Sequence, residues 1–123
     1  MIISDISLHE SGQRKINWAK ATMPVLSQIE RQFIEDKPLK GLRMTISIHL
    51  EAKTAYLANV LRSGGAEVAV TGCNPLSTQD DVAAALAKNG FDVYGIRGVS
   101  IDEYVNHLKR ALSHRPNIII DDG

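Results

Sequence analysis

The chain of 123 residues is long enough for one domain with a buried core. Its 14 basic and 14 acidic residues cancel, so the net charge gives no reason to expect nucleic acid or an anionic membrane surface as a partner. Aromatic residues make up 5% of the chain, which is too little for a surface that stacks bases. Nucleic acid and membrane surfaces are therefore not expected as partners.

Cysteine usage and apolar runs bear on the compartment. Cys73 is the only cysteine, so an intramolecular disulfide is impossible, and a zinc site would need histidine or carboxylate ligands. The N-terminal stretch MIISDISLHESG has no apolar core of signal-peptide length, and no run is long enough to span a bilayer. We expect a cytoplasmic protein without a metal site.

The N-terminal region is predicted to be helical. Apolar side chains recur every three or four positions over residues 10–34, which is the period of an amphipathic helix. Pro24 lies inside this run and predicts a kink or break near Met23, because proline cannot continue the backbone hydrogen bonding. The segment DKPLKG, residues 36–41, then predicts a turn.

The middle of the chain predicts strand, helix and strand. Residues 43–50 alternate apolar and polar side chains and predict a strand. Residues 51–63 predict a helix that ends at Gly64 and Gly65. Residues 66–72 (AEVAVTG) predict the second strand, and the polar stretch CNPLSTQDD follows it.

The last third continues the alternation. Ser77 or Thr78 is expected to cap a helix over DDVAAALAKNG, whose two aspartates suit the positive end of the helix dipole. FDVYGIRG predicts the third strand, and Ser100 with Glu103 predicts a capping box at the next helix. The apolar run in NIIIDDG predicts a fourth strand that is buried on both faces.

Strands that alternate with helices predict an α/β fold with right-handed crossovers. We expect a Rossmann-like or flavodoxin-like three-layer sandwich, with a four-stranded, mainly parallel sheet and helices on both faces. Ligands bind at the carboxyl ends of strands in such sheets. Those ends are residues 49–51, 71–74, 97–98 and 121–123.

Two features at that edge are candidates for chemistry, and each has a structural alternative. His49 ends a strand, and histidine exchanges a proton near neutral pH, although a purely structural role is equally compatible with its position. Asp121 and Asp122 end the fourth strand, where adjacent carboxylates are commonly only solvated. Because side chains alternate along a strand, one of the two is expected to face the cleft.

Other candidates carry less weight. His9, His107 and His114 lie in polar segments and are expected to be exposed. Cys73 has no basic partner in the sequence that favours its thiolate, so a packing role is expected instead. The chain contains no GxGxxG fingerprint, so it cannot complete a nicotinamide enzyme by itself.

Four segments, in this order, resemble the N-terminal part of S-adenosylhomocysteine hydrolases: DISLHESGQRKINWAKATMPVL, KPLKGLRMTISIHLEAKTA, GGAEVAVTGCNPLSTQDDVAAALAKNG and PNIIIDDG. The likeness runs from Asp5 to Gly123. The most specific part is CNPLSTQD, which closely matches the family motif SCN-x-x-STQD. The resemblance identifies residues 1–123 as the N-terminal part of a substrate-binding domain, with the NAD-binding domain absent from this chain.

The resemblance implies reversible hydrolysis of S-adenosyl-L-homocysteine to adenosine and L-homocysteine. In this family a tightly bound NAD oxidises the ribose 3′-hydroxyl, the 4′ proton becomes acidic, and the thiol leaves by elimination. The full-length enzyme is expected to be a cytoplasmic homotetramer that binds NAD. This chain alone is expected to bind no NAD and to be inactive.

The family's site residues transfer to this chain one by one. The resemblance gives His49 and Asp122 catalytic roles in proton transfer near the ribose and the leaving group. It assigns substrate binding to the STQ residues Ser77, Thr78 and Gln79, and it gives Cys73 a secondary role. Asp81 stands where the family often has a histidine.

The chain departs from the family where many members have H-M-T-x-E/Q-T-A, because it has HLEAKTA. Glu51 replaces a substrate-facing threonine, and Lys53 replaces the Glu or Gln that reads the adenine edge. Lysine can only donate hydrogen bonds, which suits the 6-oxo group of hypoxanthine better than the 6-amino group of adenine. The alternative substrate is therefore S-inosylhomocysteine, unless Lys53 turns outward and another residue reads the base.

Two further readings from other classes stay open. One is a stand-alone nucleoside-binding α/β module without catalysis. The other is a signalling or scaffold domain that uses the fold alone.

Overall fold

The computed structural model describes residues 1–123 and confirms the predicted alternation of helices and strands. None of its helices has the length and apolar character needed to cross a membrane. The elements in chain order are a short 3₁₀ turn Ile6–Leu8, α1 His9–Thr22, α2 Pro24–Asp36, β1 Arg43–Ser47, α3 Ala52–Ser63, β2 Glu67–Thr71, α4 Asp80–Lys88, β3 Asp92–Tyr94, α5 Ile101–Ala111 and β4 Ile118–Asp121.

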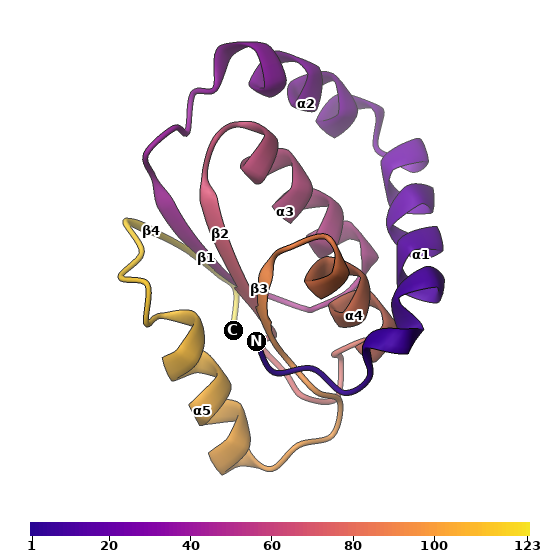
Figure 1. Ribbon diagram of the computed structural model, residues 1–123, viewed down its shortest axis with the longest axis vertical. Coiled ribbons are helices and arrows are strands. Elements are labelled where there is room, and N and C mark those ends of the chain that lie inside the picture. The colour runs from indigo at the N-terminus through magenta and orange to yellow at the C-terminus, as the bar shows by residue number, and fades with distance from the viewer.

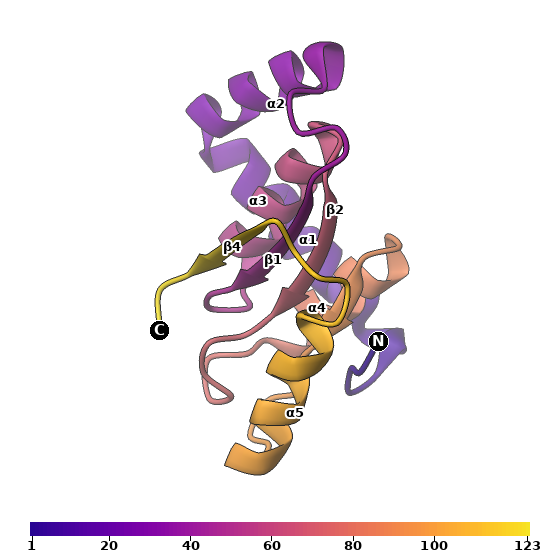
Figure 2. The ribbon, with the colours of Figure 1, turned by 90° about the vertical axis from the view of Figure 1, so that its left-hand side faces the viewer.

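The four strands form one parallel sheet in the order β3-β2-β1-β4. The chain runs from β1 outward to β2 and then to β3 at one edge of the sheet. It then crosses back over the sheet, and β4 pairs with the free side of β1. With right-handed crossovers, this reversal puts α5 on the opposite face of the sheet from α3 and α4 (Figure 1). Figure 2 shows the same arrangement from the side, and it confirms the predicted three-layer α/β sandwich.

The first two helices form an outer layer over α3 and α4. The helical run breaks at Met23, as predicted, and α2 begins with Pro24, where the missing N–H costs no hydrogen bond. Helix α1 packs against α3 and α4, and α2 packs against α3 (Figure 1). At Gly12 the approach to α4 is so close that a Cβ would overlap the carbonyl oxygen of Asp81.

The core lies between the sheet and α3 and α4. Ile46 of β1 and Val70 of β2 are fully buried, as are Val82 and Leu86 of α4, and all four belong to one apolar cluster. Both helices contribute several small buried side chains to this cluster, namely Ala52, Ala55 and Ala58 of α3 and Ala83 and Ala85 of α4. This packing positions the site.

The prediction that the fourth strand is buried on both faces is wrong. β4 is an edge strand that pairs only with β1, and the exposed fraction of Ile119 is 55%. Helix α5 packs against β2 and β3 and leaves β4 uncovered. An apolar run indicates a strand, but it does not indicate whether that strand lies at the centre or the edge of the sheet.

The predicted caps are only partly confirmed. Ser100 caps α5, because its hydroxyl oxygen accepts from the N–H of Glu103 at 3.2 Å. Ser77 and Thr78 do not cap α4, which begins at Asp80 without a side-chain cap. Their hydroxyls instead donate to the carbonyl of Asn74, at 3.0 and 3.3 Å, and close a tight turn before the helix.

Candidate functional site

The carboxyl edge of the sheet brings together two chain segments that are distant in sequence. β1 is followed by His49, and its neighbour β4 is followed by Asp122. The strand order reverses between these two strands, which is the point in an open α/β sheet where ligands bind. Backbone bonds tie the loop after β2 to this edge: the N–H of Cys73 donates to Ile48, and that of Gln79 donates to Leu50.

An open cavity of about 600 Å³ lies at this edge. Ligand pockets typically measure roughly 300–1,000 Å³, so a nucleoside with a short side arm fits the space. Every predicted site residue except Thr78 lines the cavity. The lining residues are Ile48, His49, Glu51, Lys53, Thr54, Ser77, Gln79, Arg97 and Asp122.

Thr78 is the one predicted site residue that the structure places elsewhere. Its side chain is 2% exposed, and its hydroxyl is turned to the carbonyl of Asn74. A Cβ on Gly72 would lie 2.9 Å from the Thr78 hydroxyl oxygen, so the two residues pack tightly beneath the rim. Thr78 therefore supports the loop and does not line the cavity.

His49 is exposed at the rim and bonded to the loop after β2. Its Nδ1 lies 2.7 Å from the hydroxyl oxygen of Ser77. The same ring nitrogen lies 3.5 Å from the sulfur of Cys73. The imidazole is thus held through one nitrogen, and its Nε2 has no protein partner.

Cys73 has the basic neighbour that the sequence did not reveal, because His49 is 24 positions away in the chain. Burial nevertheless raises the pKa of the Cys73 thiol, and the adjacent carboxylate of Asp122 raises it further. A raised pKa disfavours the thiolate. The expectation of a packing role therefore stands, although the thiol sits beside the site.

The paired aspartates separate as the strand geometry predicts. Asp122 lines the cavity, whereas Asp121 does not, and Oδ1 of Asp121 accepts from the N–H of Gly123 at 3.0 Å. Tyr104 of α5 donates to the carbonyl of Cys73 at 3.0 Å, beneath this end of the sheet. Burial raises the pKa of the Tyr104 hydroxyl, which therefore stays protonated as a donor.

Glu51 and Lys53 line the cavity at the start of α3. Glu51 caps α3: its Oε1 accepts from the N–H of Thr54 at 3.0 Å. That bond gives Glu51 a structural reason to be present, apart from any contact with a ligand. Lys53 is exposed, lines the cavity and has no hydrogen-bond or ion-pair partner within the chain. This position is compatible with contact between Lys53 and a base, and the alternative in which another residue reads the base stays open.

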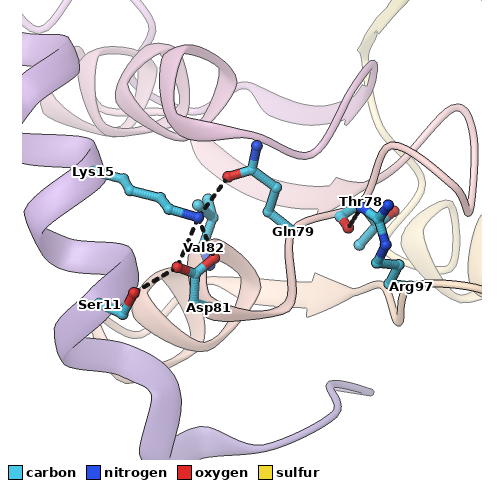
Figure 3. Close-up of polar contacts among 7 residues, drawn as sticks. All are labelled: Ser11, Lys15, Thr78, Gln79, Asp81, Val82 and Arg97. Atoms are coloured by element: carbon cyan, nitrogen blue, oxygen red, sulfur yellow. Dashed lines mark hydrogen bonds and ion pairs between the residues drawn. The ribbon is translucent and has the colours of Figure 1, made fainter.

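Three lining residues were not predicted as site residues: Ile48, Thr54 and Arg97. Arg97 follows β3, and its position near a strand end was the one signal in the sequence that could have indicated a place in the site. The backbone N–H of Arg97 donates to Oδ1 of Asp80 at 2.9 Å. The guanidinium Nη1 of Arg97 lies 3.4 Å from the carbonyl oxygen of Thr78 (Figure 3). The cavity is thus lined by two acidic side chains, Glu51 and Asp122, and by two basic side chains, Lys53 and Arg97.

The remaining histidines lie away from the cavity. The expectation that all are exposed is wrong for His107, which is 2% exposed on α5 with its Nε2 3.3 Å from a carboxylate oxygen of Glu103. His107 is buried because it occupies the inner face of an amphipathic helix. His114 is half-buried, and its Nε2 lies 2.8 Å from the hydroxyl of Thr45. His9 is also half-buried.

The cavity edge carries neither a metal-binding cluster nor a glycine-rich turn after β1. No group of three or more His, Cys, Asp or Glu side chains is arranged to hold a metal ion. The turn after β1, residues 48–51, contains no glycine that would let a pyrophosphate approach the backbone. What the cavity offers is a proton-exchanging imidazole, a carboxylate and several donors around a space of nucleoside size.

Known proteins match the chain along its whole length. The family model described as S-adenosyl-L-homocysteine hydrolase matches residues 1–123. An S-inosyl-L-homocysteine hydrolase of Methanocaldococcus jannaschii is 57% identical, and an adenosylhomocysteinase of Pyrococcus abyssi is 55% identical, each over 98% of this chain. The chain spans 29% of the length of both relatives. It belongs to the S-adenosyl-L-homocysteine hydrolase family.

Proposed function

We propose that residues 1–123 form the N-terminal part of the substrate-binding domain of an adenosylhomocysteinase, which reversibly hydrolyses S-adenosyl-L-homocysteine to adenosine and L-homocysteine. The observation that carries the proposal is the convergence of His49, Asp122 and Gln79 on one cavity. These residues follow three different strands, and the family resemblance assigns them to one substrate.

The two proposed catalytic groups suit proton transfer. Cleaving the carbon–sulfur bond requires removal of a proton from the sugar and delivery of a proton to the departing thiolate. The free Nε2 of His49 and the carboxylate of Asp122 both border the cavity, so a nucleoside placed there meets an acid/base group from β1 and another from β4. The chain's part in the reaction is therefore binding and proton transfer.

The turn after β1 contains no glycine, so it does not have the glycine-rich form that binds the pyrophosphate of NAD. We therefore assign no step through NAD to this chain. In the complete protein, we propose that NAD is bound outside residues 1–123 and that the enzyme assembles as a homotetramer.

Lys53 favours a second candidate, hydrolysis of S-inosyl-L-homocysteine. Its ammonium group lines the cavity without a partner, and it can donate to the 6-oxo group of hypoxanthine but cannot accept from the 6-amino group of adenine. Glu51 is the nearest carboxylate in sequence, and its Oε1 is already engaged at the start of α3. The relatives named above include both activities.

The test is the turnover of S-adenosyl- and S-inosyl-L-homocysteine by the complete protein, measured as homocysteine release. Cleavage of either thioether supports the proposed reaction, and a higher kcat/KM for the inosyl compound supports the role of Lys53. A strong preference for the adenosyl compound eliminates the inosyl candidate. Binding without cleavage of either compound would instead indicate a binding module.

A further inference from the structure

The side chain of Gln79 is held from outside the cavity that it lines. Nζ of Lys15, on α1, lies 3.1 Å from Oε1 of Gln79 (Figure 3). An ammonium group can only donate hydrogen bonds, so this contact selects the carbonyl oxygen of the amide. The Nε2 group of Gln79 has no partner within the chain, which leaves both of its hydrogens available as donors.

Lys15 is itself fixed by a carboxylate. Its Nζ lies 2.9 Å from Oδ2 and 3.1 Å from Oδ1 of Asp81. Oδ2 of Asp81 also accepts from the hydroxyl of Ser11 at 2.7 Å, and Oδ1 accepts from the N–H of Val82 at 2.9 Å. Figure 3 shows Ser11 and Lys15 reaching from the same helix to Asp81. The ammonium group therefore has a defined place.

The charge on Asp81 is maintained although its side chain is only 15% exposed. Burial raises the pKa of the Asp81 carboxyl, but the bonds from Lys15 and Ser11 and the charge of Lys15 lower it by more. The net result is a pKa below the ordinary aspartate value. At neutral pH the Asp81 side chain is therefore ionised and accepts hydrogen bonds from Lys15.

The helix packing explains why the contact forms. Gly12 lies between Ser11 and Lys15 on α1, and a side chain there would overlap the backbone of Asp81. The absence of that side chain lets α1 approach the first turn of α4. Ser11 and Lys15 are one helical turn apart and therefore face α4 together. Gln79 immediately precedes α4, within reach of the same lysine.

We propose that Lys15, anchored by Asp81, is a positioning residue that fixes the Gln79 amide with its NH₂ group toward the cavity, where it donates to an acceptor oxygen of the bound nucleoside thioether. This inference rests on the proposed function for the identity of the ligand. A freely rotating glutamine offers either its oxygen or its nitrogen, whereas the fixed amide selects a ligand oxygen. Lys15 thereby contributes to specificity without touching the ligand.

The molecule offers a matched control on the same helix. Lys20 forms an equally short ion pair with Glu30, at 3.0 Å, and it does not line this cavity. Lys20→Met therefore removes an exposed lysine and its ion pair from α1 without affecting Gln79. Any effect of Lys15→Met that Lys20→Met reproduces is a general effect of the helix surface.

The experiment compares Lys15→Met, Lys15→Arg and Lys20→Met in the complete protein, using the nucleoside thioether that the wild type cleaves best. Loss of one oriented hydrogen bond corresponds to a change of roughly fivefold. We expect Lys15→Met to raise KM by about that factor with kcat little changed, because the bond is made in the ground state. Lys15→Arg retains a donor and is expected to restore most of the loss. Lys20→Met is expected to match the wild type.

Two further arms separate the positioning role from the proposed function. Lys15→Met is expected to have no additional effect in a Gln79→Ala background, because the group that it positions is gone. In crystals without ligand, the Gln79 side chain is expected to lose its single orientation in Lys15→Met but not in Lys20→Met. An unchanged Gln79 or fully additive effects would overturn the proposal. Failure of the wild type to cleave either thioether contradicts the proposed function alone, since the ligand-free crystals still decide the positioning role.

Discussion

His49 Nδ1 lies 2.7 Å from the Ser77 hydroxyl oxygen, and this bond joins the end of β1 to the loop after β2. The hydroxyl of Ser77 also lies 3.0 Å from the carbonyl of Asn74, which can only accept. The single hydroxyl hydrogen is thus directed to Asn74, and Ser77 accepts from Nδ1–H of His49. This arrangement leaves Nε2 unprotonated in the neutral ring and available as a base.

Removing this hydroxyl is expected to impair the proposed proton transfer. In Ser77→Ala the imidazole loses the acceptor that selects its tautomer, so we expect kcat for the thioether to fall roughly tenfold, within the range that positioned acid–base catalysis contributes. Ser113→Ala is the matched control, because its hydroxyl makes a similar 2.7 Å bond to the carbonyl of Arg110 away from the cavity. Equal kcat values for the two variants would show that Ser77 does not orient His49.

The adjacent aspartates provide a direct test of the proposed carboxylate. Asp122 lines the cavity and Asp121 does not, so we expect Asp122→Asn to lower kcat by roughly 10²-fold or more, whereas Asp121→Asn leaves most activity. Both variants are isosteric and change the charge by the same amount. A larger loss in Asp121→Asn than in Asp122→Asn, measured by homocysteine release, would refute the assignment.

Lys53 is expected to set the preference for the base. Lys53→Glu replaces a donor by an acceptor on the cavity wall, so the ratio of kcat/KM for the inosyl over the adenosyl compound should fall by roughly tenfold or more. Lys40→Glu makes the same charge change in the exposed turn before β1 and should leave the ratio unchanged. If both variants shift the ratio equally, a long-range charge effect and not contact with the base is responsible.

The lowered pKa of Asp81 predicts a pH dependence of stability. A carboxyl whose pKa is lower in the folded state stabilises the fold above the unfolded-state pKa of about 3.8, and this contribution is lost as pH falls through the folded value. Asp81→Asn should therefore be less stable than the wild type above about pH 5, and the gap should close as pH falls below the ordinary aspartate range. Urea titrations over this range measure the gap. A gap that is independent of pH would mean that the carboxylate charge is not what matters.

Local signals in the sequence predicted the elements well. Pro24 marks the break between α1 and α2 because its ring ends backbone hydrogen bonding locally, and Ser100 caps α5 because the bond spans three residues. The set of strand ends then followed from the parallel topology. This is why His49 and Asp122 were expected at one edge even though β1 and β4 are far apart in sequence.

Features that depend on packing between distant segments were not predicted. Lys15 and Gln79 are 64 positions apart, and no local pattern indicates that Gly12 brings α1 against α4. The exposed edge position of β4 has the same origin, because strand order is a property of the whole sheet. Arg97 was expected at a strand end but was not assigned to the site, because its bonds to Asp80 and Thr78 join segments 17 and 19 positions apart.

A crystal structure of the complete protein with a bound nucleoside tests the central claim most directly. The account predicts the sugar within hydrogen-bond distance of both His49 and Asp122, with the Gln79 amide nitrogen donating to an oxygen of the ligand. A nucleoside bound at another face, with the cavity beside β1 and β4 containing only solvent, would contradict it.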